Sequence, residues 1–398
     1  MSMKLSQRVG RIQPSPTLAI TSRAKALKAA GRDIIVLAAG EPDFDTPDHI
    51  KQAGIDAILR GDTKYTAVDG TPALKQAIID KLQRDNGLDY TQDQILVSVG
   101  GKHSFFNLAQ AMLDSGDEAV IPAPYWVSYP DMVQLADAQA VFIHAGIDQG
   151  FKITPQQLDT AITANTRLVV INSPSNPTGS VYNRGELEAL GNVLRQHPQV
   201  IIATDDMYEH ILWADEPFCN IVMACPDLYD QTIVLNGVSK AYSMTGWRIG
   251  YAAGPKELIE AMKKIQSQCT SNPASMAQAA ATTALNGDQS CIVPMLKAFH
   301  ERHDRVVARL NTIPGFHCLP SLGTFYAFPL VQEAISRLAG INNDVELAAY
   351  ILDKIEVALV PGSAFGAEAY LRLSYATSME QLNTALDRLE TLFATPTG

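Results

Sequence analysis

Short runs of apolar, mostly β-branched residues alternate with stretches of helical periodicity along much of the chain. The apolar runs lie at 95–99, 118–122, 140–144, 168–172, 200–204, 232–236 and 249–254. Between several of them, apolar residues recur three and four positions apart, as in HSFFNLAQAML and RGELEALGNVLRQ. Strands that alternate with helices form crossover units. The pattern therefore predicts an α/β domain over residues 47–295, with a mostly parallel seven-stranded sheet covered on both faces.

The remainder of the chain has a different order of elements. A helical pattern over about 294–311 precedes strand-like GTFYAFPL, helical NDVELAAYILDKI, strand-like VALVPG and YLRLSYA, and a final helix from about 379. This mixed order predicts a smaller α+β domain over residues 296–398. We expect the N-terminal arm, residues 1–46, to pack with it.

Polar and glycine-rich segments follow four of the predicted strands. They are SVGGK at 98–102, NSPSNPTG at 172–179, DDMYEH at 205–210 and NGVSK at 236–240. Ligands of open α/β sheets bind beyond the carboxyl ends of the strands. These four loops therefore predict a ligand site along one edge of the sheet.

Composition narrows the classes of protein that the chain could belong to. Hydrophobic residues make up 46% and charged residues 18%, as in folded globular proteins, and the net charge of −11 argues against a general nucleic-acid or anionic-membrane surface. The five cysteines form no CxxC pair, which favours a reducing compartment over a disulfide framework or a zinc site. The chain shows neither a secretory signal nor an apolar run of membrane-spanning length. We expect a cytoplasmic protein without a metal site.

The segment GVSKAYSMTGWRIG, residues 237–250, contains two cations that could react with or bind a ligand, Lys240 and Arg248. A lysine among small and aromatic neighbours and near another cation has a lowered pKa, so Lys240 could attack a carbonyl and form a Schiff base. Arg248 could bind a phosphate bidentately. A solvated lysine and an ion-paired arginine are the alternatives. The two glycines of VGGK indicate either a tight turn or a phosphate site at a helix N-terminus.

Asp205 directly follows an apolar strand. It could cap a turn, or it could keep a heterocyclic nitrogen protonated. Tyr208 could reach the same ligand if the segment turns helically, whereas the prolines around Asn176 by themselves predict a turn. The glycine fingerprint of dinucleotide-binding enzymes is missing, which excludes a nicotinamide-dependent dehydrogenase.

Taken together, the motifs resemble those of fold type I, pyridoxal-phosphate-dependent aminotransferases. The matching segments are AGEPDFDTP, VGGK, PYWVSYP, NSPSNPTG, DDMYEH, SKAYSMTGWRIGY and LRLSYATS, in the order in which the family carries them. The nearest likeness is to bacterial class I aspartate aminotransferases of the aspartate/prephenate subgroup. The resemblance implies transfer of an amino group from an L-amino acid, with aspartate as the best guess, to 2-oxoglutarate by a ping-pong mechanism.

The resemblance also implies a role for each matching residue toward the cofactor. Lys240 would bind it covalently and move the proton, Asp205 would pair with the ring nitrogen, and Trp126 would stack on the ring. The 3-oxygen of the ring would accept hydrogen bonds from Asn176 and Tyr208. The phosphate would be held by Arg248, by the backbone at Gly101 and Lys102, and by Tyr65 of the neighbouring subunit, which implies a homodimer.

For the substrate, the resemblance implies that Arg372 binds the α-carboxylate bidentately beside the backbone of Gly40, with Asn176 and Trp126 nearby. Lys102 would bind a distal carboxylate, and a solvated lysine is the alternative.

Three features depart from the wider family. Gly237 stands where many members have a phosphate-binding hydroxyl, and Ser239 need not replace it. The segment TSNPASM lacks the second arginine of animal-type enzymes. Gln13 stands where relatives often have a basic residue, which weakens the expectation of prephenate activity.

Other activities of the same fold remain alternatives. They are an aminotransferase for aromatic amino acids, prephenate or arogenate, a pyridoxal-phosphate-dependent lyase, and a non-catalytic cofactor-binding regulatory module. The complete set of catalytic motifs argues against the last of these.

Overall fold

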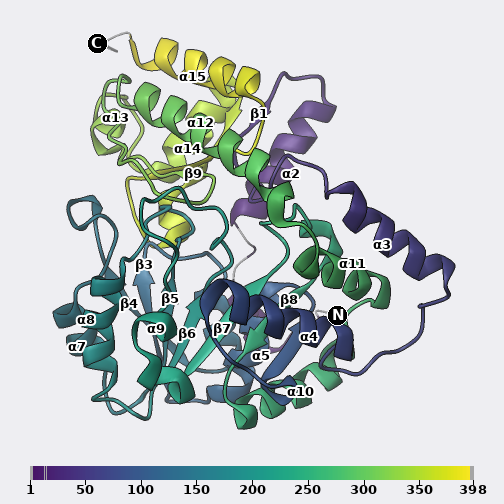
Figure 1. Cartoon of the computed structure of the whole chain (residues 1–398). Coiled ribbons are helices and arrows are strands. Elements are labelled where there is room, and N and C mark those ends of the chain that lie inside the picture. The colour runs from purple at the N-terminus through teal and green to yellow at the C-terminus, as the bar shows by residue number, and fades with distance from the viewer. Residues whose placement is uncertain (1–2, 13, 15, 395–398) are drawn as a thin grey trace.

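A seven-stranded sheet forms the centre of the fold in the computed structural model, which describes residues 3–12, 14 and 16–394 (Figure 1). Its strand order is β2–β8–β7–β6–β5–β3–β4. The strands are β2 (Ile95–Ser98), β3 (Glu118–Ala123), β4 (Gln139–His144), β5 (Thr166–Asn172), β6 (Ile201–Asp205), β7 (Thr232–Gly237) and β8 (Gly250–Ala253). Only β8 runs antiparallel to its neighbours in this sheet. The predicted mostly parallel, seven-stranded α/β architecture is confirmed.

Alternate residues of the strands point into two apolar layers. In β5, Val169 belongs to the layer under α4 (Pro72–Lys81), α8 (Arg184–Leu194) and α11 (Ser275–Asn286). The next residue, Val170, belongs to the opposite layer, under α5 (Gly101–Met112), α6 (Tyr129–Leu135) and α10 (Lys256–Cys269). A strand buried on both faces must be apolar throughout, which is why these segments read as continuous apolar runs.

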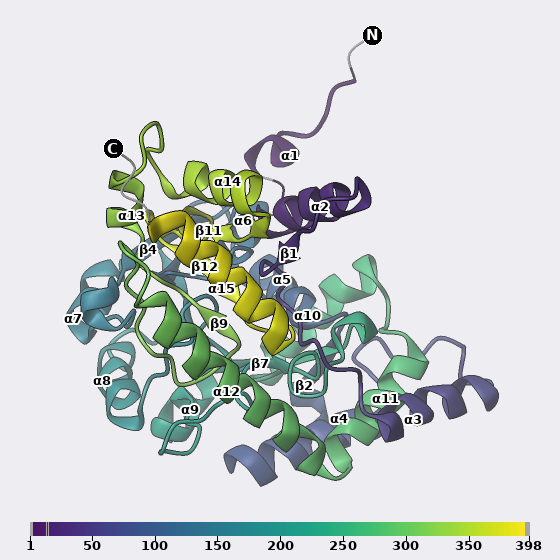
Figure 2. The same cartoon turned by 90° about the horizontal axis from the view of Figure 1, so that it is seen from above.

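A second group of elements surrounds two small sheets. Strands β9 (Tyr326–Ala327), β11 (Val360–Pro361) and β12 (Leu371–Ser374) form an antiparallel sheet in the order β11–β12–β9. Figure 2 shows the helices α12 (Val293–Leu310), α14 (Asp344–Ile355) and α15 (Met379–Ala394) in the same part of the molecule. These three helices lie within one or two residues of the predicted helical segments.

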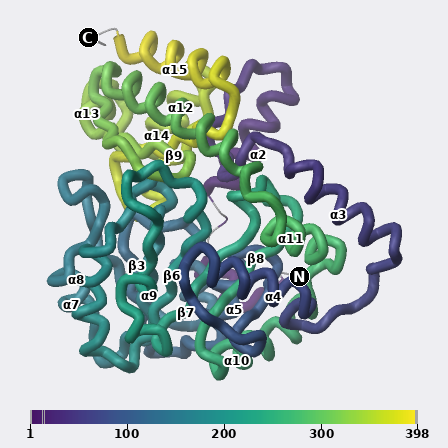
Figure 3. The backbone as a smooth tube through the Cα atoms, viewed as in Figure 1, coloured from purple at the N-terminus to yellow at the C-terminus, as the bar shows by residue number. Residues whose placement is uncertain are grey.

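The N-terminal part of the chain joins these C-terminal elements. After α1 (Gln7–Arg11) and α2 (Pro16–Ala29), strand β1 (Ile35–Val36) pairs in parallel with β10 (Val357–Ala358). An ion pair between Arg32 and Glu356 at 3.0 Å lies beside this pairing. The chain then leaves toward α3 (Asp48–Leu59), as the purple part of the tube in Figure 3 shows.

Local signals set several of the helix boundaries. The side chain of Asn183 accepts a hydrogen bond from the backbone of Glu186 and so caps α8, and Thr71 caps α4 in the same way. Helix α4 continues into a π-helical turn, Leu82–Asn86, which ends at Gly87 with φ 66°. Among the described residues, no helix combines the length and apolar character needed to cross a membrane.

Candidate active site

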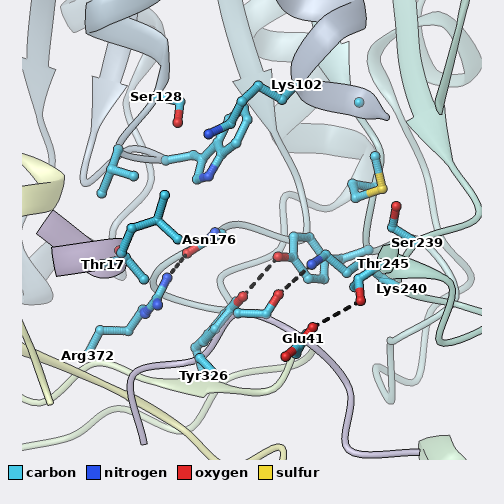
Figure 4. A pocket seen from close by; sticks show the side chains of 18 of the residues that line it. Thr17, Glu41, Lys102, Ser128, Asn176, Ser239, Lys240, Thr245, Tyr326 and Arg372 are labelled. Atoms are coloured by element: carbon cyan, nitrogen blue, oxygen red, sulfur yellow. Dashed lines mark hydrogen bonds between the residues drawn. The ribbon is translucent and has the colours of Figure 1, made fainter. Parts of the chain in front are cut away.

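The carboxyl ends of β2, β5, β6 and β7 open onto a pocket of about 450 Å³ (Figure 4). The four polar loops therefore meet at one edge of the sheet, as their positions after the strands predict. All of the predicted site residues except Tyr65 line this pocket: Gly40, Gly101, Lys102, Trp126, Asn176, Asp205, Tyr208, Lys240, Arg248 and Arg372.

Lys240 extends from the loop after β7 into the pocket (Figure 4). Its Nζ donates a hydrogen bond to the carbonyl oxygen of Gly40 at 2.5 Å and lies 5.9 Å from the ring centre of Tyr208. Burial, assisted by the positive charges of Arg372 and Arg248, lowers the pKa of Lys240 to about 8, although Glu41 and Asp205 act in the opposite direction. Lys240 is therefore poised to be a neutral, nucleophilic amine close to physiological pH.

Asp205 ends β6 at the floor of the pocket. The hydroxyl group of Tyr129 donates a hydrogen bond to its Oδ2, and the backbone N–H of Met207 donates one to its Oδ1 at 3.2 Å. Burial raises the pKa of Asp205, while the hydrogen bond from Tyr129 lowers it. Two donors thus stabilise the carboxylate in a site that would otherwise favour its neutral form.

Tyr208 and Asn176 approach the pocket from two different loops. The Tyr208 hydroxyl lies 3.1 Å from the hydroxyl of Tyr326, which comes from β9. The side-chain oxygen of Asn176 accepts a hydrogen bond from Arg372 Nη1 at 2.9 Å, and its backbone N–H donates to Asn172 Oδ1 at 2.9 Å. The side chains of Asn176 and Arg372 thereby hold each other in place.

The start of α5 and Arg248 form one polar corner of the pocket. Gly100 has φ 85°, and a Cβ at this position would lie 2.3 Å from Arg248 Nη2. A Cβ at Gly250 would likewise lie 2.3 Å from the backbone nitrogen of Gly101. Glycine at both positions lets the guanidinium and strand β8 lie against the helix start. A helix N-terminus beside an arginine is well suited to bind a phosphate.

Arg372, in β12, is 2% exposed. Its Nη2 donates to the carbonyl oxygen of Ala38 at 2.9 Å, and its Nε is buried without a hydrogen-bond partner in the described part of the chain. The guanidinium lies over the ring of Tyr326 at 4.4 Å, and none of the described acidic side chains forms an ion pair with it. A buried cation with an unsatisfied donor favours an anionic ligand at this end of the pocket.

Lys102 lies on another side of the pocket from Arg372 (Figure 4). The Nζ of Lys102 lies 5.3 Å from the ring centre of Trp126. Burial, together with the charge of Arg248, lowers the pKa of Lys102. Because Lys102 stands in the first turn of α5, where the helix dipole disfavours a cation, an anionic ligand would stabilise it.

The glycine at position 237, which replaces the phosphate-binding hydroxyl of many family members, has a steric explanation. It pairs with Gly250 of the adjacent strand, and a Cβ at position 237 would lie 2.9 Å from the carbonyl oxygen of Ile249. A serine or threonine would therefore require a shift of the backbone. The hydroxyl-bearing Ser239, two residues later, lines the pocket and is buried (Figure 4).

Two positions singled out in the sequence lie elsewhere. The side chain of Tyr65 is 91% exposed and does not line the pocket of its own chain. Gln13 lies outside the described residues.

Sequence reasoning missed several residues of the site. Tyr129 stands in the quoted segment PYWVSYP, yet only its neighbour Trp126 was expected to have a role. Tyr326 contacts both Tyr208 and Arg372, and Glu41 accepts a hydrogen bond from Thr245 at 3.0 Å. Tyr129 and Glu41 stand inside matching motifs, which was the only available signal for them, whereas Tyr326 lies in the strand-like GTFYAFPL, outside the matching motifs.

These groups fit pyridoxal phosphate and an amino-acid substrate. Lys240 supplies a nucleophilic amine, Asp205 a carboxylate stabilised by two donors, and Arg248 with the start of α5 a phosphate site. The unpaired Nε of Arg372 adds a donor for a carboxylate.

Comparisons with known proteins agree with this chemistry. The family model for aminotransferase class I and II matches residues 32–389. An aspartate/prephenate aminotransferase from Nitrosomonas europaea is 60% identical over 98% of this chain and 100% of its own, and an aspartate aminotransferase from Geobacillus stearothermophilus is 51% identical over 97% and 98%. The crystal structure of the aspartate aminotransferase from Rhizobium meliloti superposes with a TM-score of 0.95 at 47% identity, covering 98% of both chains. The chain therefore belongs to the class I and II aminotransferases and is an enzyme that transfers amino groups with pyridoxal phosphate.

Proposed function

We propose that the enzyme transfers the amino group of L-aspartate to 2-oxoglutarate in two half-reactions of a ping-pong mechanism. The observation that carries this proposal is the pair of cations on different sides of one pocket. Arg372 is buried without an acidic partner among the described residues, and Lys102 lies over Trp126. Two separated cations suit a substrate with two carboxylates. The names of the Nitrosomonas and Geobacillus relatives, both of which include aspartate, support the same substrate.

Each residue has a proposed task toward the cofactor. Bound pyridoxal phosphate supplies an electron sink for the substrate's α-carbon. Lys240 would hold the cofactor covalently, and its Nζ, once released by the substrate's amine, would take the α-proton, while Asp205 would hold a proton at the ring nitrogen. Asn176 and Tyr208 would donate hydrogen bonds to the ring oxygen, Trp126 would contact the ring, and Arg248 with the backbone of Gly101 and Lys102 would bind the phosphate.

Arg372 has the proposed task of orienting the substrate. Its guanidinium binds the α-carboxylate bidentately, beside the backbone of Gly40 and the side chains of Asn176 and Trp126. Lys102 binds the distal carboxylate, because it lies over Trp126 and stands on another side of the pocket from Arg372 (Figure 4).

A substrate scan tests this function. Aspartate, glutamate, phenylalanine and alanine are each combined with 2-oxoglutarate, oxaloacetate and prephenate, except for the identity pairs aspartate–oxaloacetate and glutamate–2-oxoglutarate, and the kcat/KM of the amino donor is measured for every other pair. The proposal requires a higher kcat/KM for aspartate than for phenylalanine or alanine, with 2-oxoglutarate as the acceptor. A higher kcat/KM for phenylalanine than for aspartate would refute the dicarboxylate assignment.

Prephenate is the second candidate acceptor. Relatives from Nitrosomonas europaea and Cereibacter sphaeroides, 60% and 52% identical, are named aspartate/prephenate aminotransferases. The same scan decides this point, because measurable turnover of prephenate with aspartate assigns the second activity. Its absence restricts the enzyme to the aspartate reaction.

We also propose that the enzyme is a cytoplasmic homodimer in which Tyr65 reaches the phosphate site of the neighbouring subunit. Apolar side chains of α3 are exposed beside it, with Ile58 at 54% and Leu59 at 78%. An apolar surface of this kind is typical of a subunit interface. The free thiols of all five cysteines suit a reducing compartment. Sedimentation measures the dimer, and Tyr65→Phe should weaken cofactor binding.

The proposed division into domains follows the sheets. The seven-stranded sheet belongs to a large domain over residues 47–295, and the two small sheets belong to a domain over residues 296–398 together with the arm, 1–46. Limited proteolysis tests this division; Met295 itself is buried inside α12 (Val293–Leu310), so cleavage is expected at exposed residues just before that helix, such as Asp288.

A further inference from the structure

A buried ion pair lies behind the pocket and does not line it. Lys81, the last residue of α4, is 1% exposed and forms a salt bridge with Glu209, which is 6% exposed. Lys81 also donates to Asn86 Oδ1 at 2.8 Å. Burying two charges is costly unless both are fully hydrogen-bonded, so a pair in this position calls for a reason.

The carboxylate of Glu209 accepts from several donors. Besides Lys81, Asn86 Nδ2 donates to its Oε2 at 3.0 Å, and Asn236 Nδ2 donates to its Oε1 at 2.8 Å. His210 Nε2 lies 3.4 Å from the same Oε1. Only an ionised carboxylate can accept from all of these groups, because a protonated carboxyl would direct its own O–H toward one of the donors.

The pKa of Glu209 agrees with an ionised carboxylate at this position. Burial by itself would raise the pKa of Glu209, but Lys81, His210 and Asn86 together lower it to about 2. The carboxylate is therefore ionised throughout the working range of the enzyme, and the hydrogen bonds that it accepts persist.

These contacts join the two loops that carry the proposed cofactor ligands. Glu209 belongs to the segment 205–210, which contains Asp205 and Tyr208. Asn236 belongs to the end of β7, four residues before Lys240, and its Oδ1 accepts from the backbone N–H of Gly237 at 2.7 Å. Through Glu209, the end of α4 thus connects to both loops.

We propose that Lys81 and Glu209, linked through Asn236, are positioning residues that hold the loop of Asp205 and Tyr208 in register with the loop of Lys240. This inference rests on the proposed roles of Asp205, Tyr208 and Lys240 toward the cofactor. It predicts that breaking the connection affects cofactor binding even though Lys81 does not touch the pocket.

The test compares two buried ion pairs of the same helix. Lys81→Met breaks the pair with Glu209, and Lys75→Met is the matched control. Lys75 is also in α4 and pairs with Asp69 at 2.7 Å, with side chains 8% and 14% exposed, but it contacts neither loop. Asn236→Ala is the second variant, because it cuts the link between the loops and leaves the Lys81–Glu209 pair in place.

Three quantities are measured for each purified enzyme: the Kd of pyridoxal phosphate, the pH midpoint of its visible absorbance when bound, and the urea midpoint of unfolding. We expect Lys81→Met and Asn236→Ala to raise the Kd by about tenfold, the lower end of what losing an outer-sphere partner costs in metal sites. Both should also move the absorbance midpoint. Lys75→Met should lower the urea midpoint and change the Kd by less than about twofold, as expected for an independent site.

The positioning role is overturned if either Lys81→Met or Asn236→Ala changes the Kd and the absorbance midpoint no more than Lys75→Met does. If Lys81→Met does not fold, the result for Asn236→Ala decides alone. Failure of the proposed function gives a different result, in which the wild-type enzyme binds pyridoxal phosphate without a covalent bond to Lys240.

Discussion

Replacing Arg372 separates its proposed role in substrate binding from its role in the fold. Arg372→Leu removes the guanidinium and keeps an apolar side chain between Tyr326 and Phe365, whose ring centres lie 4.4 and 4.8 Å from it. Arg372→Lys retains a positive charge but loses the planar pair of donors. In both variants the unpaired Nε is lost.

The expected loss follows from the hydrogen bonds that a bound α-carboxylate would accept. Each hydrogen bond to a charged group contributes about 1.5–3 kcal/mol, so two of them correspond to a fall in kcat/KM of about 10²- to 10⁴-fold in Arg372→Leu. Arg372→Lys should lose about ten- to a hundredfold, because a lysine offers a point charge in place of the fork. Replacing a buried charge by an apolar side chain is often neutral or stabilising, which offsets the lost bonds to Asn176 and Ala38.

Steady-state kinetics with aspartate, phenylalanine and alanine measure the effect, and a thermal melt of each variant measures the fold. Since all three substrates carry the same α-carboxylate, kcat/KM should fall by a similar factor for each, while Tm changes by only a few degrees. A loss restricted to aspartate would refute the reasoning, because it would assign Arg372 to the distal carboxylate. A loss below about threefold for every substrate, less than 1 kcal/mol, would remove Arg372 from substrate binding altogether.

Three further predictions concern other groups of the pocket. Lys102→Ala should lower kcat/KM for aspartate and glutamate about tenfold or more and leave that for alanine unchanged, since only the dicarboxylic substrates lose a charged partner. Equal losses for all substrates would contradict a distal-carboxylate role. The pKa of Lys240 is lowered to about 8, so the neutral, reactive fraction of its amine grows as the pH rises through 8 and is then complete. The rate at which apoenzyme attaches pyridoxal phosphate should therefore level off above about pH 9, where an ordinary lysine would still be gaining reactivity, and Lys240→Ala should retain no covalent cofactor after borohydride treatment. Tyr129→Phe removes a hydrogen bond that lowers the pKa of Asp205, so this pKa should rise. The acidic limb of the kcat–pH profile should then move to higher pH. An unchanged limb would show that Tyr129 does not act through Asp205.

The sequence predicts the large sheet well because its strands are buried on both faces. The runs 168–172 and 232–236 are apolar on both faces and so stand out in the sequence as continuous apolar segments. The first lies within β5 and the second within β7. The loops that follow the strands then meet at one edge because the strands are parallel. Position along the chain is therefore enough to bring Asp205 and Lys240 together.

Other parts of the site depend on contacts that no local pattern encodes. Tyr129 reaches Asp205 across 76 positions, and Lys81 reaches Glu209 from the end of a helix on the face of the sheet, where a lysine in helical periodicity looks like an ordinary surface residue. The glycine at 237 becomes intelligible only when the carbonyl of Ile249 is seen beside it. The role of Tyr65 requires a second subunit, and it stays a prediction.

The pairing of β1 with β10 bears on when the enzyme becomes active during synthesis. Beyond β1, the backbone oxygens of Ala38 and Gly40 accept hydrogen bonds from Arg372 and Lys240, and the bond between Ala38 and Arg372 joins residues 334 positions apart. The bond between Ala38 and Arg372 therefore cannot form until nearly the whole chain has been synthesised. Contacts of such long range form slowly because the intervening chain must first be ordered. A ribosome-bound chain that has completed the large sheet would hold Lys240 without its partner at Gly40 in place, and a product truncated before residue 357 would lose β10 together with Arg372. An incomplete chain would therefore lack the complete pocket.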